Sequence, residues 1–185
     1  MKLNKQYMSG AIICKSLYGA TRQYSDWLAT GLRLKVFESE DPSLALNDYD
    51  YLVIGTSVYF GKMLLKDWLA KNKRALTGKP VFLFVVCATP NSEPNKQHQI
   101  VEQNVPAGLV SKQNIYFLPG RVSREQLSWK HSLILWIGAH MEKDPRKKAA
   151  MSGDIDGVEP AQLAGILDGV KSFLTSSAPA QTSPA

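Results

Sequence analysis

The sequence has few cysteines and no long hydrophobic run. Its 185 residues include only Cys14 and Cys87, both in apolar stretches and without the spacing of a metal site. No apolar run reaches the ~18 residues that a membrane-spanning helix needs. The opening residues lack the apolar core of a secretory signal. We therefore expect a reduced, cytoplasmic protein, and the spacing of His, Asp and Glu predicts no metal site.

Positive charge is in modest excess. There are 22 Lys and Arg residues against 16 Asp and Glu, a net charge of +6, and 44% of the residues are hydrophobic. This composition excludes a wholly disordered chain. The basic residues form two stretches, each of which is either a solvated helix face or a surface that attracts an anionic partner. The stretches are Lys62, Lys66, Lys71, Lys73, Arg74 and Lys79, and then Arg121, Arg124, Lys130, Lys143, Arg146, Lys147 and Lys148. Because they do not alternate with stacking aromatics, we expect no nucleic-acid partner.

Short apolar runs alternate with longer helical patterns along the chain. Five runs rich in Val, Ile, Phe and Tyr predict strands. They cover residues 10–14, 34–37, 51–55, 81–86 and 114–118. Helices are predicted over residues 21–32, 64–75, 95–105, 123–142 and 158–174. This alternation predicts an α/β fold with a doubly wound parallel sheet. We expect one domain over residues 9–175 and a disordered, Pro-rich tail over residues 176–185.

The first candidate site segment follows the first strand, at the edge where doubly wound sheets bind ligands. Its residues are Ser16, Leu17, Tyr18, Gly19, Ala20 and Thr21. Gly19 permits a tight turn whose N–H groups, together with two hydroxyls and the helix dipole, would favour a phosphate. The other interpretation is an ordinary helix start that Thr21 caps.

The second segment lies between Gly55 and Gly61 and follows the third strand. Its candidate residues are Ser57, Val58, Tyr59, Phe60 and Gly61. Glycine at both ends and two adjacent aromatics suit a loop that covers a flat ring, although both aromatics could also be core residues. A phosphate-binding loop of the nucleotide triphosphatase type is excluded, because Met63 stands where the Mg²⁺-binding Ser or Thr would be.

The third segment follows the fourth strand and is polar and rich in proline. It begins with Cys87, Ala88 and Thr89. A cysteine so near a ligand site could be redox-active. Nothing beside Cys87 in the sequence would lower its pKa, and there is no second cysteine two residues away, so we favour a buried structural thiol.

Two of these segments together resemble the flavodoxin-like superfamily: SLYGAT after the first strand and DYDYLVIGTSVYFGK across the third. The resemblance implies strand order 2-1-3-4-5, with FMN at the point where the order reverses. It implies that residues 16–21 hold the FMN phosphate and that the next two segments clamp the isoalloxazine ring. Tyr18 stands where electron-carrier flavodoxins have a hydroxyl residue. The third segment lacks their ring-stacking tyrosine, so Tyr59 or Phe60 must cover the ring.

Within that superfamily the chain is most similar to the menaquinone-dependent protoporphyrinogen IX dehydrogenases. The likeness lies in IGTSVYFGK, the basic balance and an extra helical segment after the fifth strand. It implies an FMN enzyme that oxidises a porphyrinogen and reduces a quinone. A one-electron flavodoxin shuttle with a redox-protein partner, an NAD(P)H-dependent reductase, and a binding module that has lost FMN remain open. The catalytic residues are not identifiable, and we assign no role to His98, His131 or His140.

The segment after the fifth strand carries an amphipathic helical pattern with basic residues at both ends. Its apolar residues fill about half of a helical wheel, which is wider than one docking face needs. It is either a core helix or, through residues 123–148, a peripheral contact with the inner face of a membrane.

Overall fold

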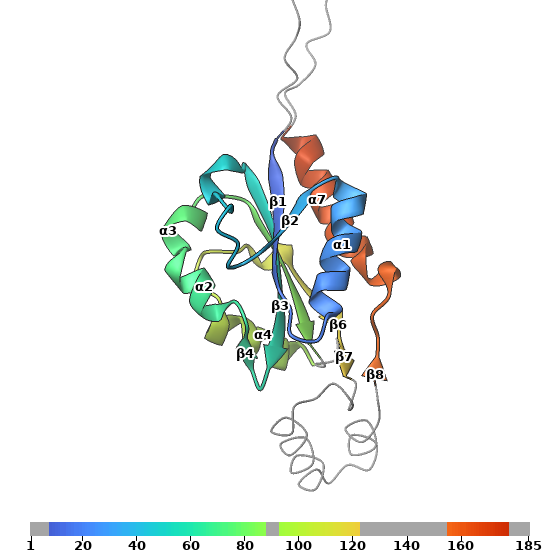
Figure 1. Ribbon diagram of the computed structural model, residues 1–185. Coiled ribbons are helices and arrows are strands. Elements are labelled where there is room, and N and C mark those ends of the chain that lie inside the picture. The colour runs from blue at the N-terminus through green and yellow to red at the C-terminus, as the bar shows by residue number, and fades with distance from the viewer. Residues whose placement is uncertain (1–7, 88–92, 123–154, 178–185) are drawn as a thin grey trace, which may run out of the picture.

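The computed structural model describes residues 8–87, 93–122 and 155–177 (Figure 1). Its centre is a parallel sheet whose five long strands run in the order β2-β1-β3-β5-β6. The strands are β1 (Gly10–Lys15), β2 (Lys35–Glu38), β3 (Tyr51–Tyr59), β5 (Val81–Cys87) and β6 (Ile115–Pro119). The short β4 (Lys62–Met63) pairs only with β3 and lies outside this order. When the five long strands alone are numbered along the chain, their order is the expected 2-1-3-4-5, which is confirmed.

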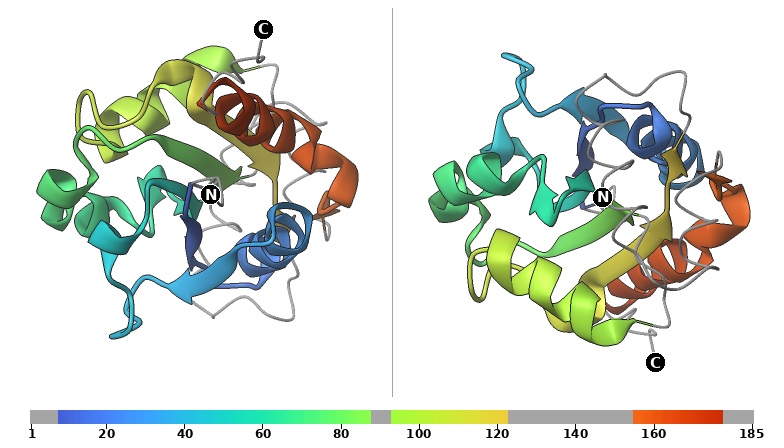
Figure 2. Two further views of the ribbon diagram at one scale, coloured as in Figure 1. Left: turned by 90° about the horizontal axis from the view of Figure 1, so that it is seen from above. Right: turned by 90° about the horizontal axis from the view of Figure 1, so that it is seen from below.

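Helices cover both faces of the sheet, which explains why the central strands are apolar throughout. On one face lie α1 (Ala20–Leu32) and α7 (Ala164–Ser176), which follows the short η4 (Pro160–Leu163). On the other lie α2 (Lys66–Lys71), α3 (Lys73–Leu76) and α4 (Pro94–Asn104) (Figure 2). Successive strand residues alternate between the two cores: Ile12 packs on the α1 side and Ile13 on the α4 side.

Some predicted elements differ from those observed. The helix predicted over residues 64–75 is two short helices, interrupted at Asn72, whose side-chain Nδ2 donates to the carbonyl of Trp68 at 2.9 Å. The predicted last helix begins as the 3-10 turn η4, where Pro160 stands. Two further 3-10 turns, η1 (Leu46–Asp48) and η2 (Lys112–Asn114), precede β3 and β6. The helix predicted over residues 123–142 lies outside the described residues.

A small antiparallel pair lies beside the carboxyl end of β6. It consists of β7 (Arg121–Val122) and β8 (Ile155–Asp156). The Arg121 Nε lies 2.7 Å from the Asp156 Oδ2, and the Tyr24 hydroxyl of α1 donates to the Pro119 carbonyl at 3.0 Å. Val122 and Ile155, the described residues on either side of segment 123–154, are therefore adjacent in space.

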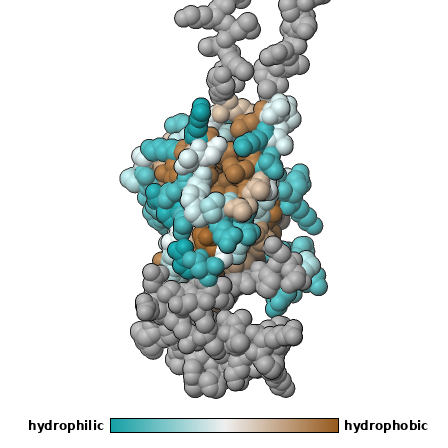
Figure 3. Space-filling model, turned by 90° about the vertical axis from the view of Figure 1, so that its right-hand side faces the viewer, coloured by the Kyte–Doolittle hydropathy of each residue, from teal (hydrophilic) through white to brown (hydrophobic). Residues whose placement is uncertain are grey.

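The described helices are all too short or too polar to cross a membrane. On the side of the molecule that carries α1 and α7, hydrophobic residues are visible between hydrophilic ones (Figure 3).

Candidate functional site

The predicted site segments meet at one edge of the sheet. The loop from β1 to α1, the turn after β3 and the last residue of β5 all lie at the carboxyl ends of three neighbouring parallel strands (Figure 1). Strand order reverses here, because the chain moves from β1 outward to β2 and then back past β1 to β3. In open α/β sheets this is where ligands bind.

The loop after β1 leaves the start of α1 open. Gly19 is the residue before the helix and has φ 81°, a left-handed conformation, and no side chain caps α1. A Cβ at Gly19 would meet nothing within 4 Å, and the first turn contains no acidic residue. The unpaired N–H groups at the start of a helix and its dipole both favour an anion.

Thr21 does not cap α1, so that interpretation of the sequence is wrong. It is the second residue of the helix and is fully buried. Within the part of the chain that the structure describes, its Oγ1 has no hydrogen-bond partner. A buried hydroxyl without a partner is unfavourable. A ligand acceptor at the helix start would supply what the hydroxyl lacks.

The second segment is a β-hairpin and not the loop that the sequence predicted. β3 continues through Ser57, Val58 and Tyr59, and β4 turns back on it so that Tyr59 pairs with Lys62. The strand extends because this pairing satisfies backbone groups that a loop would leave to water. Ser57 is buried in β3, with 7% of its surface exposed.

Two residues make the hairpin turn, and both have positive φ: Phe60 at 48° and Gly61 at 77°. This is the conformation that a type I′ turn requires. At the start of this segment, a Cβ at Gly55 would lie 2.2 Å from the ring of Phe84. Gly55 therefore leaves the space that the ring of its cross-strand partner Phe84 occupies.

Apolar side chains are exposed at this edge. Among the described residues the large hydrophobics with high exposure are Leu17 at 52% and Phe60 at 62%. Tyr18 and Tyr59 join the two segments through an edge-to-face contact, with ring centroids 5.6 Å apart and an interplanar angle of 62°. Phe60 is therefore not a core residue, and Tyr59 is half-buried.

The tyrosine at the end of β3 stays neutral at physiological pH. Burial, with a smaller contribution from the nearby Tyr18, raises the pKa of Tyr59 to about 12. Cationic groups beside the site are already paired: Lys15 contacts Glu40, and the Arg22 Nη1 lies 2.9 Å from the Glu38 Oε1. The hydrogen bond from Lys15 is the main cause that lowers the pKa of Glu40.

The third segment is described only at its start. Cys87 is the last residue of β5, is 7% exposed and forms no disulfide. A structural thiol has this kind of buried position. Ala88 and Thr89 lie outside the described residues. In the first basic stretch, Lys62 is paired with a carboxylate, since its Nζ lies 3.1 Å from the Asp67 Oδ2, and Lys79 donates to the carbonyl of Tyr49 and keeps its charge. Within the described ranges no group of His, Cys, Asp and Glu could hold a metal ion.

One buried residue that supports the β3–β4 hairpin was not predicted from the sequence. Asn104, the last residue of α4, is 4% exposed and its side chain hydrogen-bonds the β3–β4 hairpin at Gly61 and Met63. A single asparagine near the end of a helix carries no signal for such a contact, because the partner segment lies about forty residues away.

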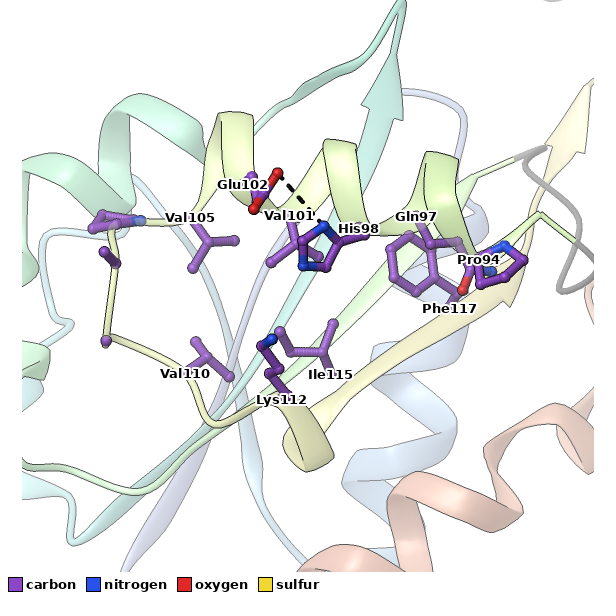
Figure 4. Close-up of a pocket in the computed structure, with 13 residues that line it drawn as sticks. Pro94, Gln97, His98, Val101, Glu102, Val105, Val110, Lys112, Ile115 and Phe117 are labelled. Carbon is purple, nitrogen blue, oxygen red and sulfur yellow. Dashed lines mark ion pairs between the residues drawn. The ribbon is translucent and has the colours of Figure 1, made fainter.

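A hollow lies between α4 and β6 (Figure 4). It has a volume of about 610 Å³ and apolar walls that include Val101, Val105 and Ile115. The His98 Nδ1 lies 3.5 Å from the Glu102 Oε2 at its rim. It contains none of the residues predicted for the site.

A family model described as flavodoxin domain matches residues 11–149, more than half of the chain. The chain belongs to the flavodoxin domain family. Its fold is shared with a flavodoxin, WrbA-like protein from Agrobacterium tumefaciens, at 15% identity over 91% of this chain and 98% of that one, with a TM-score of 0.51.

Other solved flavodoxin-fold structures match less closely in shape. A flavoprotein from Lactobacillus acidophilus in complex with FMN has 16% identity over 60% of this chain and 92% of that one, with a TM-score of 0.45. The flavodiiron protein from Giardia intestinalis has 15% identity over 94% of this flavodoxin-family chain but only 39% of its own, with a TM-score of 0.48. No curated protein matches the sequence.

Proposed function

We propose that the chain binds FMN at the carboxyl edge of the sheet and works as a redox protein. One observation carries the proposal: the open start of α1 and the exposed Phe60 turn are joined by the Tyr18–Tyr59 ring contact. A site for an anion and a site for a flat apolar ring thus lie side by side. Membership of the flavodoxin domain family supports the same ligand.

The residues present fit FMN. The N–H groups from Gly19 to Thr21 and the unpartnered Thr21 hydroxyl would hold the phosphate, which needs no lysine because the helix start already favours an anion. Phe60 and Leu17 offer the exposed apolar surface that would cover the ring, with Tyr59 beneath the turn. FMN, when bound, accepts a hydride or single electrons and passes them on.

We further propose that the substrates are a porphyrinogen-like donor and a quinone acceptor. The support is the resemblance of IGTSVYFGK, the net charge of +6, which would attract a substrate bearing carboxylates, and the exposed Leu17 and Phe60, which would contact a flat ring. Contact with an acidic membrane surface through residues 123–148 belongs to the same proposal, and that segment lies outside the described residues.

FMN and riboflavin binding test the first proposal, because riboflavin has the ring but no phosphate. We expect fluorescence titrations to show that Thr21→Val weakens FMN about 10- to 100-fold, the loss of one hydrogen bond to a charged group. Riboflavin affinity should stay unchanged. Because the hydroxyl has no hydrogen-bond partner among the described residues, the free energy of unfolding of the flavin-free variant should not fall.

Thr30→Val is the matched control on the same helix. The Thr30 hydroxyl is exposed and donates to the Asp26 carbonyl at 3.0 Å, away from the helix start. This variant should bind both flavins like the original chain. Equal FMN affinity in Thr21→Val and Thr30→Val would show that the Thr21 hydroxyl at the start of α1 does not bind the FMN phosphate.

An anaerobic redox titration of the FMN-loaded protein, followed by assays with a porphyrinogen and a quinone, tests the second proposal. Uptake of both electrons in one step, with porphyrinogen oxidation, supports a dehydrogenase. Two well-separated one-electron steps without porphyrinogen oxidation would favour the single-electron shuttle. The positive net charge should also raise the two-electron potential above that of acidic carrier flavodoxins.

A further inference from the structure

A buried amide side chain at the end of α4 hydrogen-bonds the hairpin turn. The Asn104 Oδ1 accepts from the Met63 N–H at 2.9 Å, and its Nδ2 donates to the Gly61 carbonyl at 2.7 Å and the Ile100 carbonyl at 2.8 Å. Both amide donors are therefore in use, together with the acceptor oxygen. At 4% exposure, Asn104 acts where water does not compete.

The segment that Asn104 holds contains Phe60, one of the two non-glycine residues with positive φ among the described residues; the other is Arg33. Phe60 has φ 48°, which residues other than glycine and asparagine seldom adopt, and its ring is exposed. Such a conformation persists only where the surroundings impose it. Asn104 contacts the backbone just after Phe60, on both sides of Lys62.

We propose that Asn104 is a positioning residue that fixes the Phe60–Gly61 turn in the orientation that presents the Phe60 ring to the flavin. The part of this inference that concerns the flavin rests on the proposed function, whereas the hydrogen bonds of Asn104 to the hairpin do not depend on it. Asn104 acts through Gly61 and Met63, so its loss should disturb the ring side of the site and leave the phosphate side at Gly19 and Thr21 intact.

Two measurements separate this role from a general contribution to stability. The first is amide hydrogen exchange of Met63 in the flavin-free chain, relative to Leu83 in the central strand β5. In Asn104→Ala the Met63 amide loses its acceptor and should exchange at least about tenfold faster, which is the loss of one net hydrogen bond. Asn104→Asp keeps a carboxylate acceptor and should exchange more slowly than the alanine variant.

The second measurement is the dissociation constant of FMN and of riboflavin. Asn104→Ala should weaken both by the same factor, about tenfold, whereas Thr21→Val weakens FMN alone. Asn104→Asp should also weaken both, because it cannot donate to the Gly61 carbonyl. Ile100→Val, which changes the core on the same helix and leaves the Asn104 side chain in place, should change neither affinity.

Two results overturn the inference while leaving the proposed function standing. One is an unchanged Met63 exchange rate relative to Leu83 in Asn104→Ala. The other is faster Met63 exchange with both flavin affinities unchanged, which would make Asn104 purely structural. If the unsubstituted chain binds neither flavin, the proposed function fails and the positioning role fails with it, while the exchange data still report the hydrogen bond.

Discussion

The left-handed residue at the hairpin turn offers a test that separates backbone strain from the ring. Phe60 has φ 48° and is 62% exposed. Replacing it by glycine or by alanine removes the same ring, so the two variants differ only in backbone preference and one methyl group. We expect Phe60→Gly to be the more stable of the two, the reverse of the usual order for these residues.

The magnitude follows from two opposing effects. An L-residue in the left-handed region is disfavoured by roughly 1–2 kcal/mol, which glycine avoids. Glycine loses more backbone entropy on folding, about 0.5–1 kcal/mol relative to alanine. The difference leaves Phe60→Gly more stable than Phe60→Ala by about 1 kcal/mol.

Urea denaturation of the flavin-free variants measures this difference directly. Ala70→Gly, at an exposed position of α2 with ordinary helical backbone, is the control and should lose about 1 kcal/mol. Both Phe60 variants should bind riboflavin equally weakly, because both lack the ring. A Phe60→Ala variant as stable as Phe60→Gly would refute the assignment of strain to this turn.

Two further predictions concern buried groups of the central strands. Burial raises the pKa of Cys14 from 9.0 to about 11, so at pH 8 its thiolate fraction is about a hundredfold lower and iodoacetamide should label it correspondingly slowly. Since the pKa of Cys14 is higher in the native chain than in the unfolded one, the stability that Cys14 contributes is present below pH 9 and is lost as pH rises toward 11. Between these pH values, urea unfolding should show a smaller loss of unfolding free energy in Cys14→Ala than in the original chain. Gly55→Ala should destabilise the chain by about 1–3 kcal/mol, because its Cβ meets the Phe84 ring at 2.2 Å; an unchanged urea midpoint would contradict that packing.

Much of the fold could be predicted from the sequence because its signals are local. The central strands contain short apolar runs that are recognisable in the sequence. A strand covered by helices on both faces, such as β5, is apolar at every position, so its run is uninterrupted. The edge that carries the site follows from the topology, since the segments after β1 and β3 must meet where the strand order reverses.

The features that were missed depend on tertiary contacts or on atypical turn chemistry. Hairpins with two-residue turns are recognised by Asn-Gly or Asp-Gly, and Phe60-Gly61 gives no such signal. The contacts of Asn104 span about forty residues, and the burial of the Thr21 hydroxyl depends on how α1 packs on the sheet. None of these is visible in a window of local sequence.

The pairing of β7 with β8 brings together the two described parts of the chain that flank residues 123–154. Val122 pairs with Ile155 and Arg121 with Asp156, so the sheet, its helices and the α7 that follows are connected across a gap that a short turn could bridge. Closing a loop between two adjacent ends costs conformational entropy, but that cost grows only slowly with the number of residues in the loop. The pairing therefore places little constraint on the number of residues between Val122 and Ile155, and insertions or deletions there should leave the strands that carry the candidate site unchanged.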